Sequence, residues 1–143
     1  MKYVREAGSD PAFLLKALSE ASGELQRCFH GLRRRELLRP AEGVMEDGWC
    51  LMAIPFHVLE VERGVSNQLE TMLSSREPEI RNVDFDDIPF REDYQSADED
   101  ELLEEFSYFR RRTSYILWDL SPGDFEHLWQ ARRYIDAMAG AVR

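Results

Sequence analysis

Apolar residues recur at every third or fourth position over four stretches of this chain, and this spacing predicts four amphipathic helices. The first is expected to begin at Ser9-Asp10-Pro11, where an N-cap residue precedes a proline, and to end near Leu38. The second is expected over about 49–74, and Pro55 predicts a kink or a late start because it lacks a backbone N–H. Its inward face is predicted to consist of Ala53, Ile54, His57, Val58, Val61, Val65, Leu69 and Met72.

Two further helices are expected in the C-terminal half. The third is predicted to begin with a capping box at Ser96-Ala97-Asp98-Glu99, and the fourth near Ser121-Pro122, with the serine as cap. The acidic stretch 76–95 between the second and third helices contains prolines and aromatic residues, which favours a loop packed over the end of a bundle. Four such helices in 143 residues predict one all-α domain over 1–143, a four-helix bundle.

Charge and composition narrow the classes of partner. The net charge is −10, with 28 acidic and 18 basic residues, which argues against nucleic acid or an anionic membrane as the main partner. No signal-peptide pattern and no membrane-spanning stretch is visible, so we expect a cytoplasmic protein with both of its cysteines reduced. The arginine clusters 33–35 and 110–112 are interpreted as solvated helix faces and ends. The three tryptophans are interpreted as packing at helix ends.

Two histidines carry the candidate chemistry, because His57 and His127 each lie on a predicted apolar helix face. Imidazole is costly to bury without a partner and is the commonest metal ligand. Glu60 follows His57 by one turn and Asp124 precedes His127 by one turn. Spacing alone leaves two interpretations open. The four residues could hold Zn²⁺, Ni²⁺, Fe²⁺ or Mn²⁺, or the histidines could be core residues satisfied by Glu60, Tyr134 or the backbone.

Other catalytic patterns are missing from the sequence. Cys50 has no histidine or basic residue beside it, which argues against a nucleophilic thiol. Three aspartates within 84–87 lack the spacing of an EF-hand loop, and no glycine-rich phosphate loop is present. Glu62 is expected to point away from the face that carries His57. The residues themselves therefore assign no catalytic group.

The chain resembles the DinB-like superfamily, also called the DinB/YfiT-like metalloenzymes, over nearly its whole length. The second helix has the layout of that family, with Gly48-Trp49 followed eight residues after the tryptophan by His57. The third matches through Asp-Glu-Leu-Leu-Glu-Glu-Phe at 100–106, followed by Arg111 and an apolar run. The segment Gly-Asp-Phe-Glu-His-Leu-Trp-Gln at 123–130 is similar to the closing family motif His-Asp-x-x-His-Leu-x-Gln.

This resemblance implies an up–down–down–up bundle, often dimeric, in which three histidines hold a divalent metal with open positions. His57 matches the first ligand of the family and His127 the last. Gly123 stands where the middle histidine would be. A piece that relatives have between the third and fourth helices is also missing. Either the chain is a naturally shortened member, or this sequence omits a segment in which the middle histidine could lie.

Three functions follow as hypotheses. The first is a metal-dependent hydrolase or thiol-dependent transferase, in which His57 and His127 bind the metal and Asp124 or Glu60 completes or orients the ligand set. It would be a homodimer acting on a small-molecule or thiol substrate. The second is a metal-free bundle that has lost the site and acts as a dimeric binding or stress-related module. The third is an acidic interaction domain whose 76–95 loop recognises a partner.

Overall fold

The structure, a computed structural model, describes three stretches of the chain, residues 10–40, 49–75 and 93–128. Three predictions concern residues outside these stretches. They are the packing of 76–92 as a loop over the end of the bundle, Tyr134 as a partner of a core histidine, and most of the fourth helix. Within the described residues the fold is helical, apart from a single isolated antiparallel β-bridge between Pro40 and Cys50. No helix in these stretches has the length and apolar character needed to cross a bilayer.

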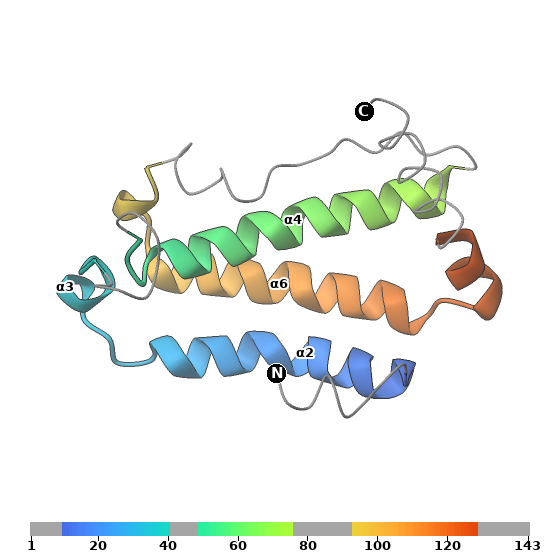
Figure 1. Ribbon diagram of the computed structural model, residues 1–143, viewed down its shortest axis with the longest axis horizontal. Helices are drawn as coiled ribbons and strands as arrows, with labels where there is room; N and C mark the ends of the chain where they lie inside the picture. The colour runs from blue at the N-terminus through green and yellow to red at the C-terminus, as the bar shows by residue number, and fades with distance from the viewer. Residues whose placement is uncertain (1–9, 41–48, 76–92, 129–143) are drawn as a thin grey trace, which may run out of the picture.

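Three long helices lie side by side, α2 (Pro11–Phe29), α4 (Ala53–Ser74) and α6 (Glu99–Trp118) (Figure 1). The short helix α3 (Arg34–Leu37) and the 3₁₀ turn η1 (Tyr94–Ser96) lie together at one end. Helix α6 packs against both α2 and α4. The chain runs in one direction along α2 and in the opposite direction along both α4 and α6, which is the predicted up–down–down order (Figure 1).

The first helix begins where the sequence predicts. The carboxylate of Asp10 accepts a hydrogen bond from the N–H of Ala12 at 3.0 Å, and Pro11 occupies the first turn. The predicted end near Leu38 is wrong, because α2 stops at Phe29. Gly31 then adopts a φ of 81°, a left-handed conformation that glycine tolerates best and that turns the chain toward α3.

Helix α4 starts at Ala53, so Pro55 lies in its first turn and the predicted late start is confirmed. Ala53 and Leu69 of the predicted inward face are buried as expected, but the rest of that face is wrong by one residue of rotation, about 100°. The face packed on α6 carries Phe56, Leu59, Glu62, Ser66 and Leu69. The expected face is only partly covered, and Val65 on it is 40% exposed. Both faces of α4 carry apolar residues, so the choice between them depends on where α6 lies.

The start of α6 also differs from the prediction. Asp98 is the cap, and its carboxylate accepts from the N–H groups of Asp100 and Glu101 at 2.9 and 3.2 Å. Ser96 belongs to η1 instead, and its hydroxyl donates to the carbonyl of Asp93 at 2.9 Å. The predicted capping box at Ser96 is therefore wrong, and the cap of α6 lies two residues later.

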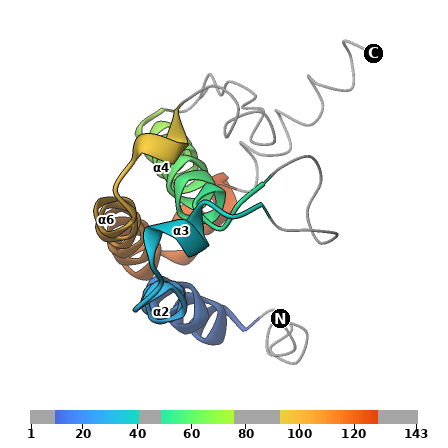
Figure 2. The same ribbon diagram turned by 90° about the vertical axis from the view of Figure 1, so that its left-hand side faces the viewer.

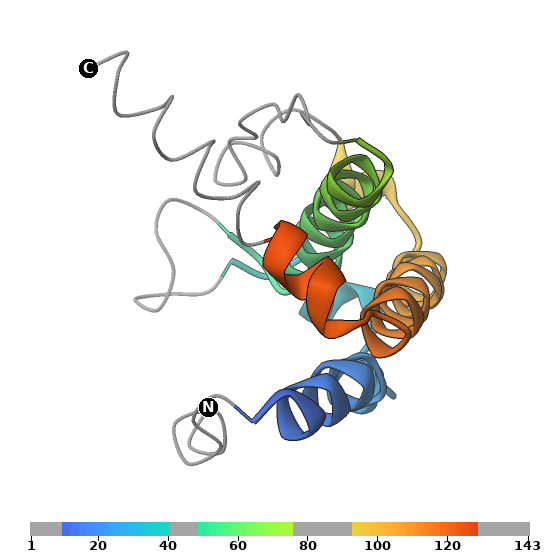
Figure 3. The ribbon, with the colours of Figure 1, turned by 90° about the vertical axis from the view of Figure 1, so that its right-hand side faces the viewer.

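The fourth helix begins as predicted. Residues 122–128 are helical, and Figure 3 shows them between the ends of α2 and α4. Ser121 caps this helix, because its hydroxyl oxygen accepts from the N–H of Asp124 at 3.2 Å. The N–H and hydroxyl of Ser121 donate in turn to the Asp124 carboxylate at 2.8 and 2.6 Å. The described residues therefore form a four-helix-bundle fold, with the start of the fourth helix included.

The apolar core is concentrated at the end of the bundle that holds α3 and η1, seen face-on in Figure 2. There Arg34 joins α3 to the start of α6, because its guanidinium donates to the carbonyls of Gln95 and Ala97 and lies 3.5 Å from Glu99. The core itself comprises Phe29, Leu37, Cys50, Met52, Ala53, Phe56, Tyr94 and Leu103.

Candidate metal site and buried polar centre

His57 lies near the start of α4, on the partly covered face rather than in the core. Its Nδ1 atom is buried and has no hydrogen-bond partner among the described residues. The indole ring of Trp49 lies against it, with ring centroids 5.5 Å apart. An imidazole nitrogen that is buried without a partner costs free energy, so His57 keeps an atom suited to a metal or another acceptor or donor.

His127 has a structural role at the opposite end of α4. Its Nε2 lies 2.8 Å from the carbonyl oxygen of Met72 and 3.0 Å from that of Ser75. The last carbonyls of a helix have no partner within the helix. An N–H at Nε2 donates to both oxygens and satisfies them, so His127 joins the fourth helix to the end of α4.

The structure does not bring His57 and His127 together. Met72 follows His57 by fifteen residues in α4, and a rise of 1.5 Å per residue separates them by about 22 Å. Metal–nitrogen bonds are roughly 2 Å long, so one ion does not bind both histidines in this arrangement. The prediction that the two histidines share a site therefore does not hold in this arrangement. A sequence motif specifies residue types, but the distance between the two histidines depends on how the fourth helix enters the bundle.

The two predicted carboxylate ligands are engaged elsewhere. Glu60 pairs with Arg63, which also pairs with Glu105 of α6. Burial would lower the pKa of Arg63, but the hydrogen bonds and charges of Glu105 and Glu60 raise it. Asp124 holds the N-terminus of its own helix, and the hydrogen bonds from Ser121 lower the pKa of the Asp124 carboxyl. Within the described residues, no three His, Cys, Asp or Glu side chains are grouped closely enough to hold a metal.

A buried ion pair that sequence analysis missed lies at the centre of the bundle. The Arg110 guanidinium of α6 is 2.7 Å from the Glu62 carboxylate of α4, and the two side chains are 17% and 4% exposed. The guanidinium also lies over the ring of Phe106, 5.0 Å from its centroid. The prediction that the arginines 110–112 are all solvated is therefore wrong for Arg110. Drawing the apolar stripe of α4 through Phe56 and Leu59 would have placed Glu62 inside.

This polar centre is incompletely satisfied. The second carboxylate oxygen of Glu62, the Nε of Arg110 and the hydroxyls of Ser66 and Thr113 are buried without hydrogen-bond partners in the described part of the chain. Such atoms are uncommon in native interiors. These polar atoms belong to α4 and α6. The contact between the two helices is therefore apolar at the end near α3 and η1 and polar farther along.

A hollow of about 610 Å³ opens on one side of this centre. Its walls are apolar residues of α2, together with Leu117 of α6 and Phe125 of the fourth helix, and Arg110 is the charged residue among them. Its volume lies within the range of small-molecule sites, which combine apolar walls with a few polar groups. The α2 residues that line it are Pro11, Leu14, Leu15, Ala17, Leu18 and Ala21.

Comparison with solved structures agrees with this architecture. The chain is similar to YfiT from Bacillus subtilis, described as a probable metal-dependent hydrolase with an unusual four-helix bundle topology. The TM-score is 0.71 at 18% sequence identity, over 80% of this chain and 64% of that one. This chain therefore spans less than two thirds of the length of YfiT. No family model matches the sequence, and no curated protein matches it. The likeness establishes a four-helix-bundle fold.

Proposed function

We propose that this chain is a divalent-metal-dependent protein of DinB-like fold, a hydrolase or a thiol-dependent transferase, with His57 as its metal ligand on α4. The observation that carries the proposal is the buried Nδ1 of His57, which has no partner in the described residues. The fold shared with a probable metal-dependent hydrolase supports it.

The described residues fit a metal only in part. His57 offers a nitrogen, whereas His127, Asp124 and Glu60 bind other groups. A complete ligand set therefore needs residues outside the described stretches. A divalent metal in such a site supplies Lewis acidity that activates a water or a thiol for attack. His57 would hold it, and the Trp49 ring would fix the orientation of the imidazole.

The test is the metal content of untagged protein, measured by mass spectrometry after dialysis, with and without added Zn²⁺ or Ni²⁺. We expect one transition metal per chain in the wild type and none in His57→Ala. His30→Ala is the matched control, since His30 is exposed at the end of α2. His127→Ala is expected to keep its metal and to lose thermal stability.

Two results would contradict this proposal. One is the absence of bound metal from the wild type after Zn²⁺ or Ni²⁺ is added. The other is equal metal content in His57→Ala and His30→Ala. A loss of metal in His127→Ala as large as in His57→Ala would instead show that the two histidines approach each other in solution.

A second candidate function is a metal-free binding module, and the hollow beside Arg110 favours it. Arg110 is paired with Glu62, but its buried Nε–H has no partner in the described residues, and such a donor among apolar walls suits a small carboxylate with an apolar body. Decanoate is therefore expected to raise the melting temperature, whereas decanol is expected to raise it less. Ala17→Trp, which fills the hollow, should abolish the effect, and Ala12→Trp on the exposed side of α2 should not. Equal responses to the acid and the alcohol would contradict this assignment.

A further inference from the structure

Arg111 follows the buried Arg110 in α6 but lies on a different side of the helix. Successive residues of an α-helix are rotated by about 100°, so Arg111 shares its side with residues three, four and seven positions away. These are Tyr108, Tyr115 and Trp118, which are 55%, 81% and 72% exposed. The interpretation of Trp118 as a packed helix-end residue is therefore wrong, and Arg111 belongs to an exposed side of α6.

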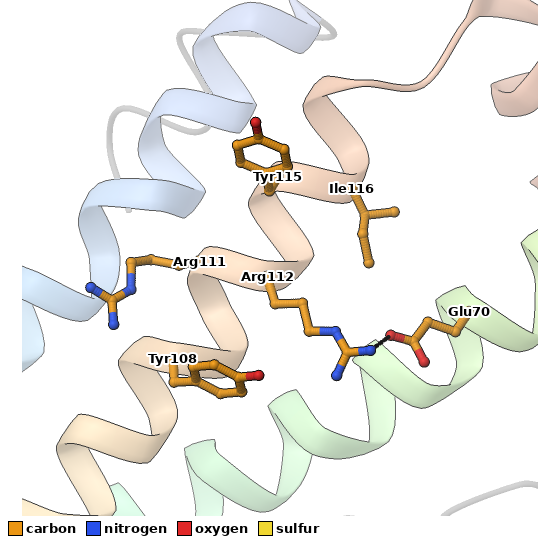
Figure 4. A pocket seen from close by; sticks show the side chains of 6 residues that line it. All are labelled: Glu70, Tyr108, Arg111, Arg112, Tyr115 and Ile116. Atoms are coloured by element: carbon orange, nitrogen blue, oxygen red, sulfur yellow. Dashed lines mark ion pairs between the residues drawn. The ribbon is translucent and has the colours of Figure 1, made fainter.

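The guanidinium of Arg111 has no counter-charge in the described part of the chain. Its two neighbours in sequence are paired, Arg110 with Glu62 and Arg112 with Glu70. Figure 4 shows Arg112 turned toward Glu70, whereas Arg111 reaches in the other direction, toward α2. Arg111 can therefore offer charge-assisted hydrogen bonds to a ligand on the α2 side.

A polar hollow of about 550 Å³ lies where Arg111 approaches α2. The residues that give it its hydrogen-bonding groups and its space are Ser22, Gly23 and Gln26 of α2 with Ser107 and Arg111 of α6. We call it the α2–α6 hollow. It differs in chemistry from the hollow beside Arg110, whose walls are apolar.

Two serine hydroxyls that line the α2–α6 hollow are not used within the fold. Ser22 is 6% exposed, and its hydroxyl has no partner among the described residues. The Oγ of Ser107 is also buried and lacks a hydrogen-bond partner in those stretches. A buried hydroxyl without a partner costs free energy, and each hydroxyl can donate one hydrogen bond and accept others. A polar ligand in the hollow would satisfy both helices at once.

Two carboxylates also line the hollow, and each has a cation of its own on α2. Glu20 lies 3.9 Å from Lys16, and Glu24 lies 3.8 Å from Arg27. Arg111 is therefore the cation of the lining that these ion pairs leave uncompensated. One such charge suits a monoanion, whereas the carboxylates of Glu20 and Glu24 would oppose the second charge of a phosphate monoester.

We propose that the α2–α6 hollow binds a small hydroxylated carboxylic acid of the sugar-acid class. The Arg111 guanidinium binds the carboxylate through two parallel N–H···O bonds. The hydroxyls of Ser22 and Ser107 and the amide of Gln26 bind the hydroxyl groups of the ligand.

This site is separate from His57 and from the hollow beside Arg110, so it stands whether or not the chain binds a metal. The two hollows also select different acids. A fatty acid has no hydroxyls for Ser22 and Ser107, and a sugar acid has no apolar body for the walls beside Arg110.

The α2–α6 hollow is open to solvent on the side of Arg111, so its affinity is expected to be modest. One bidentate ion pair and a few hydrogen bonds replace bonds to water, and the ligand loses its freedom of motion. We expect a dissociation constant on the order of 1 mM for D-gluconate.

The first test is a nuclear magnetic resonance titration of the ¹⁵N-labelled chain with D-gluconate at constant ionic strength. The amide signals of Ser22, Gly23 and Ser107 and the Nε–H signal of Arg111 should shift and saturate together. Two matched ligands separate the contributions, sorbitol with hydroxyls but no carboxylate and hexanoate with a carboxylate but no hydroxyls. Each should bind at these positions at least about tenfold more weakly than gluconate.

The second test uses variants that leave the rest of the bundle in place. Arg111→Gln should weaken gluconate binding at least about tenfold, and Arg112→Gln is the matched control because Arg112 is paired with Glu70. Ser107→Ala should weaken it a few-fold. Gly23→Leu should abolish it by filling the hollow, since a Cβ at Gly23 meets its nearest atom, on the flexible Arg27 side chain, at 3.7 Å.

Three results would overturn the proposal. They are the absence of saturating shifts at Ser22 and Ser107 up to about 20 mM gluconate, well above the expected constant, binding of sorbitol as tight as that of gluconate, and unchanged gluconate binding by Arg111→Gln. Circular dichroism of each variant checks that the helices are retained.

Discussion

The buried pair of Glu62 and Arg110 offers the sharpest test of the packing between α4 and α6. Replacing Arg110 with Met keeps the length and the apolar stem of the side chain but removes its charge. The Glu62 carboxylate, 4% exposed, is then left inside the bundle without a counter-charge. We expect this single substitution to be severely destabilising.

The magnitude follows from burial and from the unpaired atoms. Removing one partner of a buried ion pair costs about 3–5 kcal/mol, a large share of the roughly 5–15 kcal/mol that stabilises a domain. The intact pair is itself poorly satisfied, because one oxygen of Glu62 and the Nε of Arg110 lack hydrogen bonds in the described residues. Replacing both residues with Met should therefore be neutral or stabilising by up to about 4 kcal/mol.

The assay is a double-mutant cycle from urea unfolding followed by circular dichroism, with Glu62→Met, Arg110→Met and the double variant. A parallel cycle on the exposed pair of Glu24 and Arg27 is the control, since these side chains are 71% and 73% exposed and 3.8 Å apart. That pair should couple by less than about 1 kcal/mol. If Arg110→Met does not fold, Glu62→Gln, which keeps the shape of Glu62, provides a measurable step.

Two results would refute the reasoning. One is a cost of less than about 1 kcal/mol for Arg110→Met, which would mean that water reaches Glu62 in solution. The other is a double variant as unstable as the single variants, which would mean that packing, and not the uncompensated charge, sets the cost.

Three further predictions concern backbone conformation and helix ends. Asp98→Ala should lower the free energy of unfolding in urea by about 1 kcal/mol, because the cap of α6 is lost, and Ser96→Ala should lower it clearly less. A larger cost for Ser96→Ala than for Asp98→Ala would instead support the capping box expected at Ser96. Gly31→Ala should cost about 1–2 kcal/mol, because the space there is open and the φ of 81° alone opposes a side chain; an unchanged midpoint would contradict this. Asp124 has a lowered pKa in the folded protein, so its stabilisation is present above the ordinary value of 3.8 and is lost as the pH falls through the lower folded value. Asp124→Asn should remove that part of the acid dependence, and an identical pH profile in wild type and variant would exclude the contribution.

Features that depend on a few neighbouring residues were predictable from the sequence. Asp10 with Pro11, and Ser121 with Pro122, define helix starts within one turn, and both are found as predicted. The start of α6 was harder, because Ser96 and Asp98 are both good caps. The choice between them depends on η1, which ends at Ser96 and is anchored by Arg34 from a distant part of the chain.

The candidate site depends on distances between helices, which the spacing of apolar residues along the sequence does not specify. Residue spacing places His57 on one side of α4, but α6 packs on the neighbouring side, and both sides are apolar enough to be buried. His127 was expected opposite His57, and the entry of the fourth helix places it beside Met72 instead. The separation of the two histidines along α4 is visible only once the helices are arranged in space.

The position of α6 between α2 and α4 has a consequence for how the bundle opens. Among the long helices, α6 packs against two neighbours, whereas α2 packs on α6. Release of α2 leaves the contact of α4 with α6 intact, including Glu62 and Arg110. We therefore expect amide hydrogens of α2 to exchange with solvent through a partial opening of lower free energy than global unfolding, while the buried amides of α6 exchange only when the whole bundle unfolds.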